Sequence, residues 1–160
     1  MSDFDIPPPI ATRAQVVAEA RSYLGTPAHH QGRLPGVGLD CAGLPICVCW
    51  ELGLKPRSFD VKGYGPIPDG SLQRYCDEYM LRIPRSAMQP GDVILVAWHG
   101  GGPQHLGIVV DHPYRDQLAM VHALGPRKPV GGGKARVIET RLMFGRVMQC
   151  VAAYSIPGVG

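Results

Sequence analysis

Charge is scarce in this sequence, and neither sign dominates it. Charged residues make up 18% of the 160 residues and leave a net charge of +3, with the basic residues scattered along the chain. Nucleic-acid-binding proteins usually gather lysine and arginine into a patch or stripe that matches the phosphate backbone. We therefore expect no nucleic-acid partner.

Long apolar runs are also absent. No segment approaches the roughly 20 apolar residues that a membrane-spanning helix needs. The chain starts MSDFDIPPPIATRAQ, which contains no basic region followed by an apolar run, as a secretory signal peptide would. We expect a protein that is made and folded in the cytoplasm and does not insert into a membrane.

The five cysteines lack two familiar patterns. Their odd number and irregular spacing differ from a secreted disulfide scaffold, so free thiols are expected. The paired Cys-x-x-Cys spacings of common zinc and iron–sulfur sites are missing as well. A metal site built from Cys41, Cys47, Cys49 and Cys76, or from histidines, remains an alternative that metal analysis of the purified protein would test.

Apolar residues are plentiful, at 45% of the chain, and the 21 glycines and 16 prolines are spread among them. A chain of this length and composition can bury one hydrophobic core without cross-links. We predict one loop-rich domain over residues 1–160, with tails at 1–10 and 156–160.

The first half of the chain carries helical patterns. Thr12 and Gln15 have the spacing of a capping box, and apolar residues then recur at helical intervals up to Gly25. Asp40 is placed to cap a second helix that ends at Gly53. Pro45 removes a backbone donor there and predicts a local distortion or a shifted start. A short third helix is expected over 71–82.

The second half carries strand patterns. Short apolar runs lie between turn signals, and the loop HGGGPQ separates the two arms of a hairpin. Helices followed by consecutive antiparallel strands indicate the α+β class, with helices packed on a sheet of five or six strands. The expected strands are 93–98, 105–110, 118–123, 136–139 and 149–155.

Three cysteines lie close together in GVGLDCAGLPICVCW, but their positions differ. Cys41 follows the expected cap, so it would lie in the first turn of the second helix, where unpaired N–H groups favour a thiolate and can stabilise an oxyanion. Cys47 and Cys49 lie further along the helix and are interpreted as packing. Cys41 is the candidate nucleophile.

A nucleophilic thiol needs a base, and two histidines are suitably placed. His105 opens a strand after the glycine-rich loop, and His122 lies near the end of the next strand, where it can orient the first imidazole. Strand alternation puts Val121 and Ala123 on the face opposite His122. By spacing alone, half-buried structural histidines remain the more frequent case.

Four elements in order resemble the NlpC family of papain-like cysteine peptidases, which cut bacterial cell-wall peptides. These are YLGTPAHHQGRLPGVGLDCAGL, PGDVILV, QHLGIVV and VHAL. The likeness is greatest to the branch carried by tailed phages and gene transfer agents, and it spans about residues 13–155. It implies a papain-like fold, no metal or other cofactor, and a Cys-His-His triad of Cys41, His105 and His122.

The resemblance also suggests a substrate site. Asp40 either caps the helix alone or also faces the amino group of a peptidoglycan stem peptide. Many family members carry a tyrosine where this chain has Ala28, so we expect His29 or His30 to replace it as a donor, with Gln104 as a further substrate contact. Alternatively, the pocket is degraded.

The biological expectation is a peptidoglycan endopeptidase in a phage-like tail tip. A particle tail would deliver a cytoplasmically made enzyme to the wall, whereas a housekeeping wall enzyme would need export. The alternative is a catalytically weakened tail-tip or hub protein that keeps the fold. In either case tail-tip or hub proteins would be partners.

Overall fold

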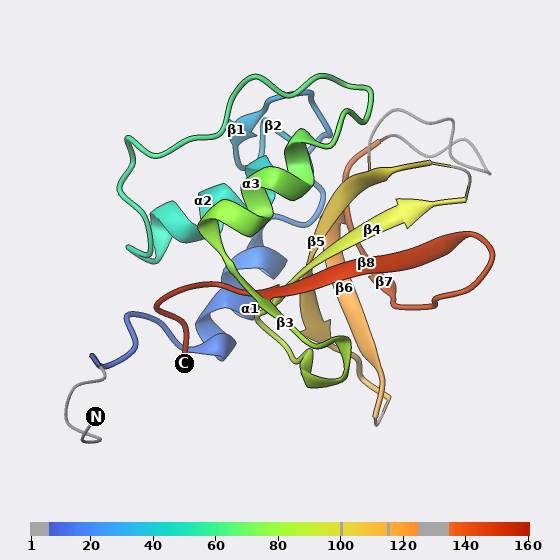
Figure 1. Ribbon diagram of the computed structural model, residues 1–160. Coiled ribbons are helices and arrows are strands. Elements are labelled where there is room, and N and C mark those ends of the chain that lie inside the picture. The colour runs from blue at the N-terminus through green and yellow to red at the C-terminus, as the bar shows by residue number, and fades with distance from the viewer. Residues whose placement is uncertain (1–6, 100, 115, 125–134) are drawn as a thin grey trace.

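The fold is an antiparallel sheet with helices gathered along one side (Figure 1). The computed structural model describes residues 7–99, 101–114, 116–124 and 135–160. The helices are α1 (Arg13–Ser22), α2 (Gly43–Glu51) and α3 (Ser71–Tyr79), with a 3-10 turn at Arg85–Ala87. The strands are β1 (Arg33–Leu34), β2 (Gly38–Leu39), β3 (Leu81–Ile83), β4 (Val93–Trp98), β5 (Pro103–Asp111), β6 (Leu118–Ala123), β7 (Val137–Arg141) and β8 (Met148–Ser155).

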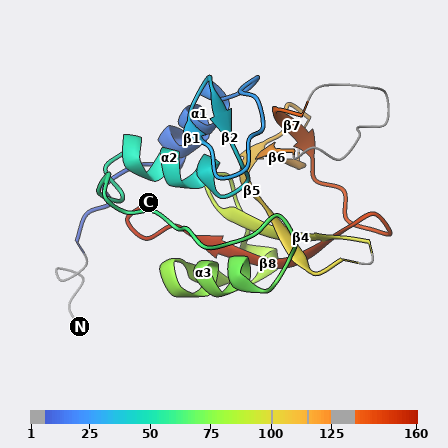
Figure 2. The same ribbon diagram turned by 90° about the horizontal axis from the view of Figure 1, so that it is seen from above.

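Six strands form the main sheet in the order β3-β8-β4-β5-β6-β7, and all of its neighbours are antiparallel. The strands β1 and β2 form a separate small hairpin before α2. Seen from above, α1 and α2 lie on one side and α3 on the other, and the loop that joins α2 to α3 runs between them (Figure 2). The α+β class and the antiparallel sheet are confirmed.

Strand alternation divides the apolar residues between the two faces of the sheet. Val93 and Leu95 of β4 pack with Val16 of α1 and Val48 of α2, whereas Ile94 belongs to a second cluster on the other face. Burying one such side chain stabilises the fold by about 1.5–3 kcal/mol. Apolar side chains are therefore buried on both faces of the sheet, and the helices pack against one of these faces.

The start of α1 agrees with the sequence prediction. The backbone N–H of Gln15 donates to the Thr12 hydroxyl at 3.1 Å, and the Gln15 side chain accepts from the Thr12 N–H at 2.8 Å. This reciprocal pair is a capping box. The helix ends at Ser22, before Gly25, which adopts the left-handed conformation.

The third helix is shorter than predicted. It ends at Tyr79, because Met80 is extended and Leu81–Ile83 pairs with β8 as the edge strand β3. Continued helix would forfeit these ladder hydrogen bonds. Neither this strand nor the β1–β2 hairpin was predicted, because each is too short to show a period.

Residues 156–160 are not a tail. Ile156 is buried, and the backbone of Gly158 and Gly160 is hydrogen-bonded to residues 10–13. These contacts join the end of the chain to the start of α1. In the other predicted tail, residues 1–6 lie outside the described residues, and 7–10 are exposed.

Candidate active site

The helix α2 begins two residues later than the sequence suggested. Gly43 is its first residue, so Cys41 lies in the turn before the helix and not in its first turn. Pro45 explains the shift, because in the first turn its missing N–H removes no intrahelical bond. Of the two outcomes predicted for Pro45, the shifted start is the one observed.

Asp40 fixes this turn through its side chain. Its Oδ1 accepts a hydrogen bond from the backbone N–H of Gly43 at 2.7 Å, which is a capping contact. A Cβ at Gly43 would collide with the carbonyl oxygen of Gly32, so only glycine fits where the helix start meets the preceding loop. The Asp40 side chain and the close contact between Gly43 and Gly32 thus fix the turn that carries Cys41.

Every acceptor position of the Asp40 carboxylate is occupied. Besides the Gly43 bond, Oδ1 accepts from Arg33 at 3.0 Å, and Oδ2 accepts from the Gln31 N–H at 2.8 Å and the Tyr64 hydroxyl at 2.6 Å. A carboxylate offers about four lone-pair positions. A substrate ammonium would therefore have to displace a donor of the protein.

Arg33 links this carboxylate to the loop before α3. Its guanidinium donates to Asp60 at 2.8 Å, to the Tyr64 hydroxyl at 2.8 Å and to the Val61 carbonyl at 3.0 Å. Because its side chain is only 13% exposed, these bonds are shielded from solvent. We call the group Arg33, Asp40, Asp60 and Tyr64 the ionic network.

The Cys41 thiol lies against the strand that carries His105. Its Sγ donates a long hydrogen bond to the Gln104 carbonyl at 4.0 Å. Burial, and then the charge of Asp40, raise the pKa of Cys41 to about 11, although the N–H groups of Leu106, Cys41 and Ala42 act in the opposite direction. The resting thiol is therefore protonated at neutral pH, contrary to the expectation of a favoured thiolate.

A β-bulge places His105 beside this thiol. Val96 of β4 pairs with His105 and Ala97 pairs with residue 103, so Gln104 is the extra residue of β5. The His105 ring is buried, and the Trp98 ring lies against it with the centroids 5.6 Å apart. The strand irregularity thus directs a buried imidazole to the end of the sheet nearest α2.

His122 lies behind His105 as seen from the pocket. The Nε2 of His105 and the Nδ1 of His122 are 2.7 Å apart, and the Nε2 of His122 is 2.8 Å from the Thr140 hydroxyl. Burial lowers the pKa of His122 to about 4, so this ring is neutral at neutral pH. We call His105, His122 and Thr140 the histidine chain.

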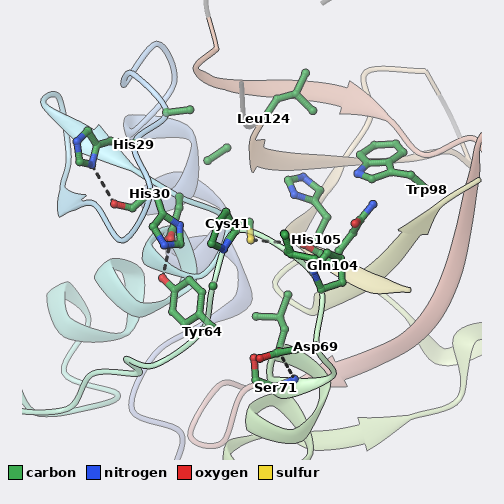
Figure 3. Close-up of a pocket in the computed structure, with 18 residues that line it drawn as sticks. His29, His30, Cys41, Tyr64, Asp69, Ser71, Trp98, Gln104, His105 and Leu124 are labelled. Carbon is green, nitrogen blue, oxygen red and sulfur yellow. Dashed lines mark hydrogen bonds between the residues drawn. The ribbon is translucent and has the colours of Figure 1, made fainter. Parts of the chain in front are cut away.

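Cys41 and His105 line one pocket of about 510 Å³, within the usual size of ligand sites. Figure 3 shows the Cys41 sulfur near its centre, between Tyr64 and His30 on one side and His105 and Trp98 on the other. His122 is not among the lining residues. The remaining walls come from Ala28, His29, Asp40, Gly65, Pro66, Ile67, Pro68, Asp69, Ser71, Leu72, Gln104, Ala123 and Leu124.

The predicted substrate contacts all reach this pocket. His29 and His30 are exposed at its rim, and the His30 ring meets Tyr64 edge-on at 5.7 Å. Gln104 holds its side-chain Nε2 buried, without a hydrogen-bond partner in the described part of the chain. Asp40 also lines the pocket, but its oxygens are bonded as described above.

The remaining cysteines do not form a site with Cys41. Cys47, Cys49 and Cys76 are buried in the core, as the packing interpretation of the first two requires, and all five cysteines are free thiols. Among the described residues, no three His, Cys, Asp or Glu side chains are grouped to hold a metal ion. In the same residues, no helix is long and apolar enough to cross a membrane.

Four residues at the site were not identified from the sequence: Arg33, Tyr64, Trp98 and Thr140. Tyr64 lies in a loop without a periodic pattern, 24 positions from the carboxylate that it contacts. A hydroxyl on a strand, such as that of Thr140, carries no signal of its own. The one sequence signal near Tyr64 is the proline-rich and glycine-rich stretch YGPIPDG, which is typical of a loop and carries no indication of function.

No protein-family model matches this chain, and no curated protein matches it either. Among solved structures, the chain is similar to the crystal structure of the NlpC/p60 domain of the peptidoglycan hydrolase SagA. The TM-score is 0.59 at 22% sequence identity, and the match covers 91% of this chain and 100% of that one. The three helices and the six-stranded antiparallel sheet therefore form the papain-like fold of NlpC/p60 domains.

Proposed function

We propose that this protein is a cysteine peptidase that hydrolyses the stem peptides of bacterial peptidoglycan. One observation carries the proposal: Cys41 and His105 line a single pocket, and a buried second histidine is bonded to the first at 2.7 Å. The similarity in fold to a domain of a peptidoglycan hydrolase supports the choice of substrate. Cys41 is the nucleophile, His105 the base and His122 the positioning residue.

The reaction begins with proton transfer from the thiol. Because the Nε2 of His105 is engaged with His122, the proton of Cys41 passes to the Nδ1 of His105. The sulfur then attacks the scissile carbonyl, and the N–H groups of Cys41 and Ala42, which already stabilise charge on this sulfur, hold the oxyanion. His105 returns the proton to the leaving amine, and water hydrolyses the thioester.

The protonated resting thiol fits this order of events. Burial opposes a lone thiolate, so charge appears on the sulfur only as His105 takes the proton and becomes its counter-ion. A protonated thiol also limits adventitious oxidation, which follows thiolate character. His105 acts here as a general base during attack.

The walls of the pocket suggest how a peptide is held. Asp40 serves chiefly to hold the turn and Tyr64, because its four acceptor positions are taken by the protein. His29 and His30, exposed at the rim, supply donors for the carbonyl and carboxylate oxygens of the substrate, and Gln104 lines the pocket beside Cys41. Trp98 offers an apolar surface on the opposite wall.

Release of new amino groups from purified peptidoglycan tests the proposed activity. The wild type should release them, and Cys41→Ala should not. Cys150→Ala is the matched control, because that thiol is partly exposed but does not line the pocket. Equal release by the wild type and by Cys41→Ala would overturn the assignment.

We propose further that the protein is a component of a phage or phage-like tail tip, made in the cytoplasm and acting in the host periplasm. The support is the resemblance of its sequence elements to the tail-associated branch. The protein should then be present in fixed stoichiometry in purified particles, bound to tail-tip or hub proteins. Its absence from such particles would contradict this role.

A weakened structural protein is the second candidate, and Ala28 is the observation that favours it. This small side chain lines the pocket where the resemblance leads one to expect a tyrosine. Particles that contain the protein but clear no cell-wall layer in a turf assay would support the structural role. Clearing that depends on Cys41 would support the enzyme.

A further inference from the structure

Thr140 stands at the end of the histidine chain. Its strand β7 pairs with β6 so that Met120 lies opposite Thr140 and His122 lies opposite Ile138. Alternate residues of paired strands share a face, so Thr140 is the diagonal neighbour of His122 on the same face. The Thr140 hydroxyl lies 2.8 Å from the Nε2 of His122.

The two hydrogen bonds of His122 constrain its single proton. Its side chain is buried, with 2% of the residue exposed, and the ring is neutral. A neutral imidazole donates from one nitrogen and accepts at the other. Since Nδ1 faces His105 and Nε2 faces Thr140, one neighbour must donate to His122 and the other must accept from it.

Only one of the two arrangements prepares His105 to act as a base. If His122 donates from Nδ1, the Nε2 of His105 accepts, and a neutral His105 must then carry its proton on Nδ1. It cannot take the proton of Cys41 in that form. If His122 donates from Nε2 to Thr140, its Nδ1 accepts from the Nε2–H of His105, and the Nδ1 of His105 is a base. The imidazolium formed during the reaction requires this second arrangement too.

We propose that Thr140 is a positioning residue whose hydroxyl oxygen accepts from His122 and so stabilises the tautomer that keeps His105 basic. The inference rests on the proposed function for its catalytic meaning, but the tautomer itself can be measured without substrate. Without the acceptor, the Nε2–H of His122 would be buried and unpaired, which destabilises the tautomer that carries this proton. This is the tautomer that the reaction uses.

Two substitutions separate hydrogen bonding from packing. Thr140→Val keeps the branched shape and removes the acceptor, whereas Thr140→Ser keeps the acceptor and removes a methyl group. Arg141→Ala is the control on the same strand, because that side chain is exposed and points to the other face. Circular dichroism and thermal melting establish that each variant is folded.

The first readout is the rate at which iodoacetamide alkylates Cys41, measured by mass spectrometry. A penalty of 1–3 kcal/mol corresponds to a rate lower by about fivefold to 150-fold in Thr140→Val. Thr140→Ser and Arg141→Ala should stay within about threefold of the wild type, since the acceptor is intact. An unchanged rate in folded Thr140→Val, or failure of serine to restore it, would overturn the proposal.

The second readout is the ¹⁵N chemical shifts of His122 in the wild type, which report the protonated nitrogen directly. The proposal requires a proton on Nε2 and a bare Nδ1. A proton on Nδ1 overturns it without any variant, even if Thr140→Val does not fold. These readouts also separate two failures: if peptidoglycan is not hydrolysed but the tautomer and alkylation results hold, only the proposed function is lost.

Discussion

Two hydrogen-bond networks meet at Cys41, and they are built in opposite ways. The ionic network holds one guanidinium between two carboxylates and a phenol, and its central carboxylate accepts four bonds. The histidine chain contains no carboxylate; its two rings and one hydroxyl are joined by bonds of 2.7 and 2.8 Å.

The two networks therefore have different roles, because the ionic network fixes the structure and the histidine chain takes part in the reaction. Opposite charges with every lone pair occupied define one arrangement, so the ionic network fixes the turn in front of α2 and the loop that carries Tyr64. In the histidine chain, His105 can gain and lose a proton at Nδ1 while its hydrogen bond to His122 is kept. Breaking the first network should therefore cost stability, and breaking the second should cost chemistry.

The largest effect is expected from His105→Ala. Removal of a general base typically lowers the rate by about 10²–10⁴-fold, so hydrolysis of peptidoglycan by the folded variant should fall by that factor. Steady-state release of amino groups measures the rate, and circular dichroism first establishes that the variant is folded. Retention of more than a tenth of the wild-type rate would show that another group accepts the proton.

The ionic network should respond in the opposite sense. Arg33→Met leaves Asp40 and Asp60 without their shared partner, and losing one member of a shielded ion pair costs about 3–5 kcal/mol. Urea unfolding measures this loss. The control is Arg57→Met, whose exposed pair with Glu51 should contribute less than about 1 kcal/mol. Equal losses in the two variants would contradict a structural role for Arg33.

The burial of His122 should make the free energy of unfolding depend on pH. Its folded pKa of about 4 lies below the unfolded value of 6.5, so the unfolded chain binds the extra proton between these pH values. Stability attributable to this residue is full above pH 6.5 and falls by about 3 kcal/mol as the pH drops to 4. Urea titrations at several pH values should show this slope in the wild type and a shallower one in His122→Gln. Identical slopes would contradict the assignment.

The smallest effect concerns the rank order of the thiols. Burial raises the pKa of Cys47 and Cys49 to about 11, the same value as Cys41, so access and the nearby base decide the order. Iodoacetamide at neutral pH should modify Cys41 first, because it lies in the pocket beside His105. Peptide mapping at short times measures the order. Labelling led by Cys47 or Cys49 would contradict the separation of the cysteine cluster into one reactive thiol and two packing residues.

Local patterns were readable from the sequence. The capping box of Thr12 and Gln15, the strand 118–123 and the effect of Pro45 all depend on neighbours within a few positions, where the chain constrains itself. The alternation that placed Val121 and Ala123 opposite His122 is equally local, and both lie in the core cluster beneath the helices.

Contacts between distant segments were not readable. Arg33 meets Asp60 across 27 positions, and Thr140 meets His122 across 18, and neither pair leaves a periodic mark. The bulge at Gln104 depends on how β5 fits β4, and edge strand β3 forms only because β8 offers it hydrogen bonds. Tertiary pairing decided these features.

Mass analysis of muropeptides is the most direct measurement of hydrolysis by Cys41. Purified peptidoglycan is digested with the wild type and, in parallel, with Cys41→Ala, and the soluble fragments are compared. We predict stem peptides cut at one defined peptide bond in the wild-type digest and an unchanged pattern with Cys41→Ala. Identical fragment masses in both digests would contradict it.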